Sequence, residues 1–342
     1  MAKTIYPLDE LHIFTSISFE KEESLDLSGI ILPVEDPNGS LVDSKREKYA
    51  LLTYQSVSFQ GGYGYLIKSF RETSTSQRTV MVKRPIREYS QLGQEALVQW
   101  LVRKTLVRYG METAIPKIYD IFRRSEQVCF SMEYIRGVFP YEYILKSATP
   151  DRVFFQMLSQ LALLCSILQK ELQFDHRDLK TDNVFIRSRP ISYSVVVGTT
   201  LYRLECPFQL VLMDFGFACL GNMKGITQLN LAKDILPQHD PCPKIGRDLF
   251  HCIASFWTDP LLRDKMSIET QREVDAWFLS GKRDYSKLIK KFSTIDWIYV
   301  LTATTDFNHE ALDAETLLSR IARLHPSILD QCPLKMGMVG GT

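Results

Sequence analysis

Two short motifs and one lysine of this chain carry side chains that could act on a phosphate group. Residues 175–183 read D-H-R-D-L-K-T-D-N, and residues 212–216 read L-M-D-F-G. Asp178 could accept a proton from a hydroxyl, and the oxygens of Asn183 and Asp214 are ligands that hard cations such as Mg²⁺ prefer. Lys180 and Lys83 could neutralise phosphate charge. These residue types suit phosphoryl transfer, in which catalysis is mostly positioning and charge neutralisation.

Elements of two kinds must position these side chains. Strand patterns dominate from residue 51 to 135, with a helical apolar spacing interposed over 90–109. Helical patterns take over from residue 150, where T-P-D at 149–151 predicts the start of a buried helix that runs to about residue 172. The sequence therefore predicts a small sheet-rich part followed by a larger helical part, joined near 135–140.

The motifs, in this order, resemble those of the eukaryotic protein kinase family. H-R-D-L-K-x-x-N at 176–183 resembles the catalytic loop, D-F-G follows it, and V-M-V-K at 80–83 precedes it. The resemblance spans about residues 51–258. It implies an α+β, bilobal protein kinase-like fold, with a small β-rich N-lobe containing one main helix and a larger, mostly helical C-lobe. The implied division is 1–50 N-terminal lead-in, 51–135 N-lobe, 136–330 C-lobe and 331–342 flexible tail.

The resemblance also implies a role for each charged residue around ATP and Mg²⁺, with Mn²⁺ as an alternative cation. Asp178 would accept or orient the proton of the attacking hydroxyl, and Lys180 would reach the γ-phosphate. Lys at that position is typical of serine/threonine kinases. Asn183 and Asp214 would bind the metal, and Lys83 would neutralise the α- and β-phosphates. We expect the five side chains to converge around one triphosphate.

A glycine cluster is similar to the family's phosphate-binding loop. Gly61, Gly62 and Gly64 would let backbone N–H groups approach the phosphates, and Leu66 would cover the adenine. Phe59 replaces the first glycine of the family pattern. The alternative interpretation is a plain hairpin turn.

The lysine's acidic partner should lie on the helix after the third strand. Glu95 is the expected partner of Lys83, because Glu88 follows the lysine too closely. The family usually has an apolar residue one turn after this glutamate, where this chain has Gln99.

The segment F-S-M-E-Y-I-R-G at 130–137 resembles the last N-lobe strand and the hinge. The resemblance makes Met132 the gatekeeper, and the Glu133 carbonyl and the Ile135 backbone would bond the adenine edge. A plain edge strand leading into a loop would place the same residues similarly.

Three further residues bear on the catalytic loop. In the family, the arginine beside the catalytic aspartate often pairs with a phosphorylated residue, which makes Thr227 a candidate phosphosite for Arg177. An ordinary loop threonine or a substrate contact is the competing interpretation. Asp248 fits the acid that opens the central helix and braces the catalytic loop.

The chain departs from the family pattern in two places. The A-P-E motif is absent from 217–247, and 30 residues separate Asn183 from Asp214. Residues 188–207 in that interval predict an inserted hairpin. Haspin resembles the chain in both respects, although this chain has D-F-G where haspin differs, and some kinases of large DNA viruses are equally divergent.

Three functions compete. The first is ATP-dependent transfer of the γ-phosphate to Ser or Thr hydroxyls of a protein substrate. The second is a pseudokinase or scaffold that binds partners through a rebuilt activation segment, which the missing A-P-E motif favours. The third is a small-molecule kinase, although such enzymes usually lack the R-D-L-K context.

Composition limits the partners and the compartment. The net charge of +1 gives no sign of nucleic-acid or membrane attraction, and none of the seven cysteines forms the C-x2-C pair typical of zinc sites. With no signal-peptide core and no apolar run long enough to span a bilayer, we expect a soluble intracellular protein, cytoplasmic or nuclear. The resemblance to divergent kinases of large DNA viruses is compatible with a viral origin. The sequence sets no oligomeric state.

Overall fold

The chain divides into two compact units. The computed structural model describes residue 27 and residues 31–60, 64–86, 91–221, 228–232, 235–237, 240–280, 283–292, 296–304 and 306–334. The barrel unit comprises Met1–Lys104, Ile115–Arg136 and Met213–Gln238. The C-terminal unit comprises Thr105–Ala114, Gly137–Leu212 and His239–Thr342.

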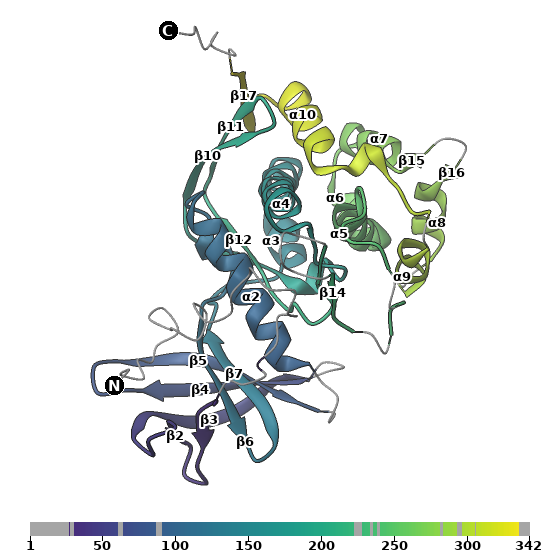
Figure 1. Cartoon of the computed structure of the whole chain (residues 1–342). Helices are drawn as coiled ribbons and strands as arrows, with labels where there is room; N and C mark the ends of the chain where they lie inside the picture. The colour runs from purple at the N-terminus through teal and green to yellow at the C-terminus, as the bar shows by residue number, and fades with distance from the viewer. Residues whose placement is uncertain are drawn as a thin grey trace, which may run out of the picture. The chain divides into compact units, whose positions relative to one another are not determined.

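Seven strands form a closed barrel in the barrel unit, in the order β1-β2-β3-β4-β5-β7-β6 (Figure 1). Neighbouring strands pair antiparallel, except that β1 pairs parallel with β6 through Val34 and Arg123 and so closes the barrel. The strands are β1 (Val34–Glu35), β2 (Ser40–Val42), β3 (Lys48–Gln60), β4 (Gly64–Glu72), β5 (Gln77–Pro85), β6 (Ile118–Arg124) and β7 (Gln127–Glu133).

Apolar side chains from several strands make the barrel core. Those that are fully buried and packed together are Leu41, Ala50, Leu52, Val80, Val82, Tyr119, Phe122 and Cys129. The alternation of Val80 and Val82 along β5 turns both toward this core, as the period of two in a strand requires. β5 is thereby fixed at its centre, which positions Lys83 near its end.

A helix and two short strands complete the barrel unit. The helix is α2 (Leu92–Val107), whose last residues belong to the C-terminal unit. β13 (Cys219–Leu220) and β14 (Leu229–Asn230) pair antiparallel. β13 begins five residues after Asp214, so the D-F-G segment leads directly into this pair.

Helices fill much of the C-terminal unit, and several begin at a residue that caps them. Asp259, Ser267, Asp284 and Asp313 each accept a hydrogen bond from a backbone N–H of the first turn, which satisfies donors that the helix leaves unpaired. The helices are α3 (Pro140–Lys146), α4 (Pro150–Leu172), α5 (Arg247–Thr258), α6 (Pro260–Lys265), α7 (Ile268–Trp277), α8 (Tyr285–Lys291), α9 (Asp296–Ala303) and α10 (Ala314–Leu324), with 3₁₀ turns η2 (Glu112–Ala114), η3 (Thr181–Asn183) and η4 (Glu310–Leu312).

α4 is the core helix of this unit. It packs against α5 and α10, and Phe155 stacks on His325 at a ring distance of 3.7 Å. α4 is long and apolar enough to cross a membrane, but 89% of its most apolar stretch is buried inside the protein. That burial agrees with the expectation of a soluble protein, whose core helices have the same composition.

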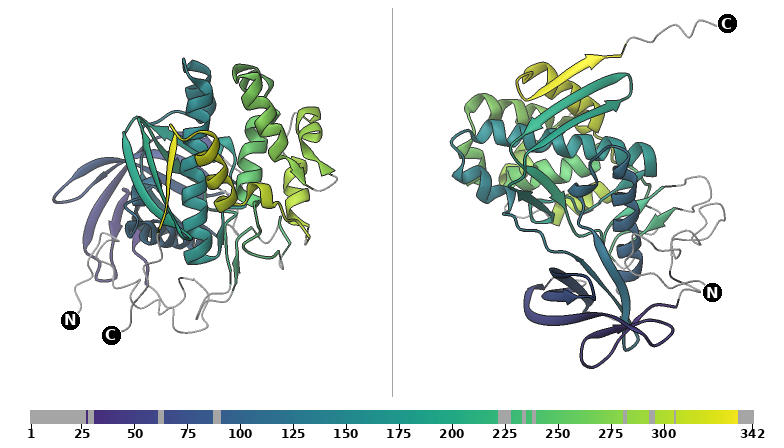
Figure 2. Two further views of the ribbon diagram at one scale, coloured as in Figure 1. Left: turned by 90° about the horizontal axis from the view of Figure 1, so that it is seen from above. Right: turned by 90° about the vertical axis from the view of Figure 1, so that its left-hand side faces the viewer.

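Small sheets accompany these helices. Figure 2 shows the strand β17 (Leu329–Pro333) beside the hairpin of β10 (Ile191–Val197) and β11 (Thr200–Cys206), to which it pairs antiparallel. β9 (Val184–Arg187) pairs with β12 (Gln209–Leu212), and β15 (Leu279–Ser280) pairs with β16 (Arg283–Asp284). The short strand β8 (Phe174–Asp175) leads from α4 into the H-R-D segment.

The expectation of a bilobal α+β fold, with a small β-rich N-lobe and a larger, mostly helical C-lobe, is wrong. The strands of the barrel unit close into a seven-stranded barrel rather than an open sheet, and the other strands form several small sheets. The parallel contact between β1 and β6 was not visible in the sequence, because the two strands lie far apart in the chain and β1 has only two residues.

Three boundaries drawn from the sequence also differ. Residues 34–50 form β1, β2 and the start of β3 rather than a lead-in, because the D-P-N-G-S turn at 36–40 joins two strands. Residues 213–238 belong to the barrel unit, not to the C-terminal unit. Pairing with β11 orders the chain to Pro333, which shortens the expected tail of 331–342; its last eight residues lie outside the described part of the chain.

Candidate functional site

A buried ammonium group is shared by two carboxylates in the barrel unit. Lys83 Nζ donates to Glu95 Oε1 at 2.6 Å and to Asp214 Oδ1 at 2.9 Å. Burial alone would lower the pKa of Lys83, but the negative charges of Asp214 and Glu95 outweigh it and raise the pKa above its ordinary value. The lysine therefore carries a full positive charge at neutral pH.

Glu95 occupies the position expected from the sequence, in the first turn of α2. Gln99, one turn later, stands where the family usually has an apolar residue, and its side chain is buried. Its amide donates to the Pro116 carbonyl at 2.8 Å, so the polar group is satisfied and its burial carries no large penalty. The departure at Gln99 thus leaves the Lys83–Glu95 pair intact.

Glycines lie where the charged cluster leaves no room for a side chain. A Cβ on Gly64 would lie 2.8 Å from the Arg84 carbonyl and 3.2 Å from the Lys83 stem. A Cβ on Gly216 would lie 3.3 Å from Asp214 Oδ1, the atom to which the Gly216 N–H points at the same distance. Asp214 itself has a φ of 60°, an uncommon conformation for a residue other than glycine and one that often marks functional sites.

The residues expected to surround an adenine lie on neighbouring strands of the barrel. Leu66 on β4 pairs with Lys83 on β5. Met132 and Glu133 on β7 pair with Met81 and Val80 on β5, and Ile135 follows the end of β7 and is buried. Gly61 and Gly62 lie outside the described residues, so their expected phosphate contacts stay predictions.

The C-terminal unit holds the second group of predicted residues in the loop after β8. Asn183 Nδ2 donates to Asp178 Oδ2 and to the Asp178 carbonyl, both at 2.8 Å. Lys180 Nζ lies 3.1 Å from both Asp178 carboxylate oxygens. The Asp178 side chain is 7% exposed and that of Lys180 is 27% exposed, so an oriented carboxylate and a more accessible cation lie side by side.

The expectation that Asp248 braces this loop is confirmed. Its carboxylate accepts from the backbone N–H of His176 at 2.6 Å and of Arg177 at 2.9 Å. Arg177 has a φ of 63°, a strained conformation for arginine. The two hydrogen bonds from Asp248 hold the backbone in that conformation immediately before Asp178.

Arg177 is paired with a carboxylate that sequence reasoning missed. Its guanidinium lies 3.1 Å from Asp240 Oδ2, and Asp240 also contacts Lys244 and Arg247, each at 2.5 Å. All four side chains are almost fully buried. Thr227, the candidate phosphosite expected to face Arg177, lies outside the described residues.

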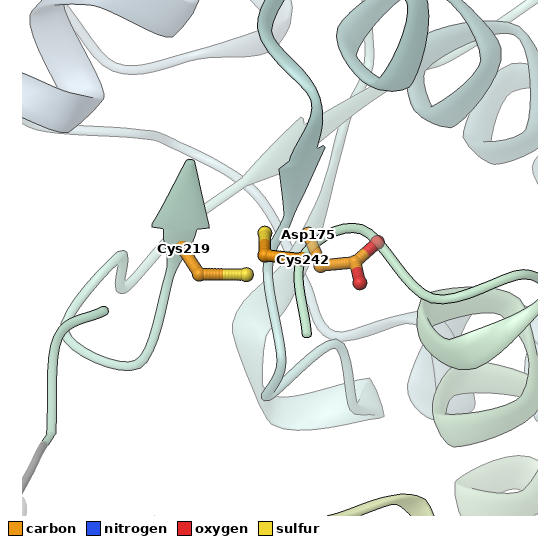
Figure 3. Close-up of side chains that lie close together, drawn as sticks. All are labelled: Asp175, Cys219 and Cys242. Carbon is orange, nitrogen blue, oxygen red and sulfur yellow. The ribbon is translucent and has the colours of Figure 1, made fainter. Parts of the chain in front are cut away.

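Asp175 forms the other end of this buried charge cluster. Arg247 binds it through two nitrogens at 2.6 and 2.9 Å, and the Lys244 N–H donates to it at 2.7 Å. Burial raises its pKa to about 6 although Arg247 opposes the rise. The Cys242 sulfur lies within 4.8 Å of this carboxylate (Figure 3). Asp175 is inaccessible and serves to hold the loop.

Tyr299 on α9 is a second residue that the sequence did not single out. Its phenol donates to Asp178 Oδ1 and accepts from Lys180 Nζ at 3.3 Å. No motif surrounds Tyr299, and 121 residues separate it from Asp178. Its only sequence signal is the apolar helical segment that carries it.

Comparison with known proteins gives one weak relationship. The chain is 25% identical over 233 residues to "Probable kinase 098L" of Invertebrate iridescent virus 3. The match covers 67% of this chain and 43% of that protein, so the chain corresponds to less than half of its length. No protein-family model matches the chain. The similarity suggests a kinase-like family.

Proposed function

We propose that this protein is an ATP-dependent protein kinase that transfers the γ-phosphate of ATP to Ser or Thr hydroxyls of a protein substrate. The observation that carries the proposal is the Lys83 ammonium shared between Glu95 and Asp214. A lysine kept charged at the end of a strand, beside a carboxylate that is 41% exposed, presents a fixed cation and an accessible metal ligand. Both are what the binding of a metal-bound triphosphate requires.

In the proposal, the C-terminal unit supplies the side chains that act on the attacking hydroxyl. In the proposal, Asp178 accepts or orients the hydroxyl proton, and its contact with Asn183 keeps it in one orientation. Lys180 is accessible enough to reach the transferred phosphate and stabilises its charge. The identity of Lys180 favours Ser or Thr as acceptor, as the family resemblance implies.

The donor set fits Mg²⁺, with Mn²⁺ as the alternative. Asn183 Nδ2 is committed to Asp178, which leaves the amide oxygen as the atom that would bind a cation. Asp214 would supply carboxylate oxygen, and both are hard ligands. The cation would neutralise phosphate charge when bound.

A viral relative named as a probable kinase supports the same class of activity. Because the chain covers only 43% of that protein, the activity of the whole relative is transferred here only as part of the proposal. We further propose that the partner is a protein, with no nucleic acid or membrane involved.

The test is transfer from γ-labelled ATP with Mg²⁺ onto an array of Ser, Thr and Tyr peptides. The proposal expects labelled Ser or Thr peptides, and a loss of at least about 100-fold in Asp178→Asn, since a general base contributes about that much. Asp182→Asn is the matched control, because Asp182 is an exposed acid in the same loop and should keep the wild-type rate.

Two results would contradict the proposal. A folded wild-type protein that labels no peptide would favour the scaffold. Labelling of small alcohols or aminoglycosides, but not of peptides, would indicate a small-molecule kinase.

A further inference from the structure

The phenol of Tyr299 lies on the carboxylate to which the proposal assigns the proton. Tyr299 Oη donates to Asp178 Oδ1, while Asn183 Nδ2 donates to Oδ2. Each oxygen of the carboxylate therefore has a different neutral donor, and the plane of the group is fixed. Lys180 Nζ lies 3.3 Å from the phenol oxygen, so one hydroxyl contacts both charged groups of the loop.

Buried contacts hold the helix that carries Tyr299. His251 on α5 bonds Thr302 Oγ1 at 2.7 Å, and its ring packs edge-on against Tyr299 at 5.0 Å. Lys244 Nζ donates to the carbonyls of Thr302 and Thr304, each at 2.8 Å. These contacts hold α9 at Tyr299, at Thr302 and just past its end at Thr304. The phenol is therefore a fixed group rather than a mobile one.

The phenol of Tyr299 is protonated at neutral pH. Burial raises the pKa of Tyr299, and the negative charge of Asp178 raises it further. A hydrogen-bond donor that stays protonated favours the charged form of the acceptor. The phenol is suited to holding Asp178 as an oriented carboxylate and is a poor nucleophile.

We propose that Tyr299 is a positioning residue of the phosphotransfer site, which orients Asp178 and Lys180 through its hydroxyl. The inference rests on the proposed kinase function. It assigns to α9 a role in holding the side chains of the catalytic loop.

Substitution of Tyr299 by Phe removes the hydroxyl and keeps the ring that packs on His251. We expect kcat to fall about 10- to 100-fold, because a hydrogen bond to a charged group is lost. The KM for ATP should change by less than about threefold, since the phenol contacts none of the residues assigned to the adenine or to the α- and β-phosphates.

Tyr285→Phe is the matched control. Tyr285 also packs near α5, against Phe250, and accepts a hydrogen bond from Arg283 rather than contacting Asp178. It should leave kcat unchanged. Equal melting temperatures of the two variants would separate positioning from stability.

The outcomes distinguish this inference from the proposed function. If the wild type transfers no phosphate, the proposed function fails and this inference fails with it. If the wild type is active and Tyr299→Phe keeps its kcat, only the positioning role is overturned. A rise in activity would show that the phenol blocks the site, and phosphotyrosine at Tyr299 by mass spectrometry would show an acceptor; either overturns positioning.

Discussion

Two clusters of charged side chains in this protein have central groups of opposite sign. In the barrel unit one cation, Lys83, is shared by two carboxylates. In the C-terminal unit one carboxylate, Asp240, is shared by Arg177, Lys244 and Arg247. Both contain buried charges that lie beside opposite charges.

The clusters differ in their access to solvent. Asp214 of the first cluster is 41% exposed, whereas the side chains around Asp240 are at most 3% exposed. A ligand can therefore reach the first cluster, while the second can only hold the protein together. The comparison indicates that strong ion pairing alone does not mark a functional site, because a ligand also needs an exposed member to contact.

The largest expected effect follows from removing the shared cation of the exposed cluster. Lys83→Met should lower the rate of phosphate transfer about 100- to 1,000-fold, because a charge assigned to the triphosphate is lost. Initial rates with γ-labelled ATP would measure it. Lys48→Met, at a lysine that pairs with Asp36 on the surface, is the control and should keep the wild-type rate. An equal loss of rate in Lys48→Met would contradict a special role of Lys83.

Removing the shared anion of the buried cluster should act on stability instead. Asp240→Asn leaves three buried cations without their common partner and should lower the free energy of unfolding by about 3–5 kcal/mol. Urea denaturation measures this. The control is Asp330→Asn, which breaks an exposed pair with Arg203 and should cost less than about 1 kcal/mol.

A similar loss of unfolding free energy in Asp240→Asn and Asp330→Asn would show that burial does not determine how much an ion pair stabilises this protein. Full activity of Asp240→Asn at a temperature where it stays folded would support a purely structural role.

The buried histidine beside the second cluster predicts a pH dependence. Burial, with the positive charges of Arg247 and Lys180, lowers the pKa of His251 to about 3 from an ordinary value of 6.5. Between these values the unfolded chain binds a proton that the folded protein does not, so stability falls as pH falls. The slope from this group approaches about 1.4 kcal/mol per pH unit below pH 6.

His251→Gln should flatten the stability curve between pH 6.5 and 4 in urea titrations. His325→Gln, at a partly exposed histidine that pairs with Glu273, serves as the control. An unchanged slope in His251→Gln would show that His251 is protonated in the folded protein.

The smallest effect is expected at the candidate phosphosite. Arg177 already contacts Asp240, so the charge that a phosphate would supply is present without modification. Thr227→Ala should therefore change the transfer rate by less than about twofold. Phosphatase treatment of the wild type gives the same comparison, and a large loss in both experiments would restore the phosphosite hypothesis.

The sequence predicted local contacts better than the fold, for a physical reason. Contacts that depend on local spacing, such as those of Asp178 with Lys180 and Asn183, can be expected from one short motif. The Lys83–Glu95 pair was also predictable, because a strand followed by a helix limits where the partner can lie. Asp248 was predicted from its place at the start of α5.

Contacts between distant segments were not predictable. Closure of the barrel depends on a two-residue strand pairing with β6 across the chain, and Tyr299 and Asp240 carry no motif. A tyrosine in an apolar helix and an aspartate in a Pro-rich loop have many ordinary explanations. Only the contact of Tyr299 with Asp178 and that of Asp240 with Arg177 distinguish these two residues from ordinary ones.

The proposal that the Lys83 group and the Asp178 group act in one chemical step is tested most directly by a double-mutant cycle. Transfer rates would be measured for Lys83→Met, Asp178→Asn and the combined variant. Groups that act as a unit are not additive, so the combined variant should lose no more than about threefold beyond the worse single variant. A combined loss equal to the product of the single losses, or single variants at the wild-type rate, would contradict the account.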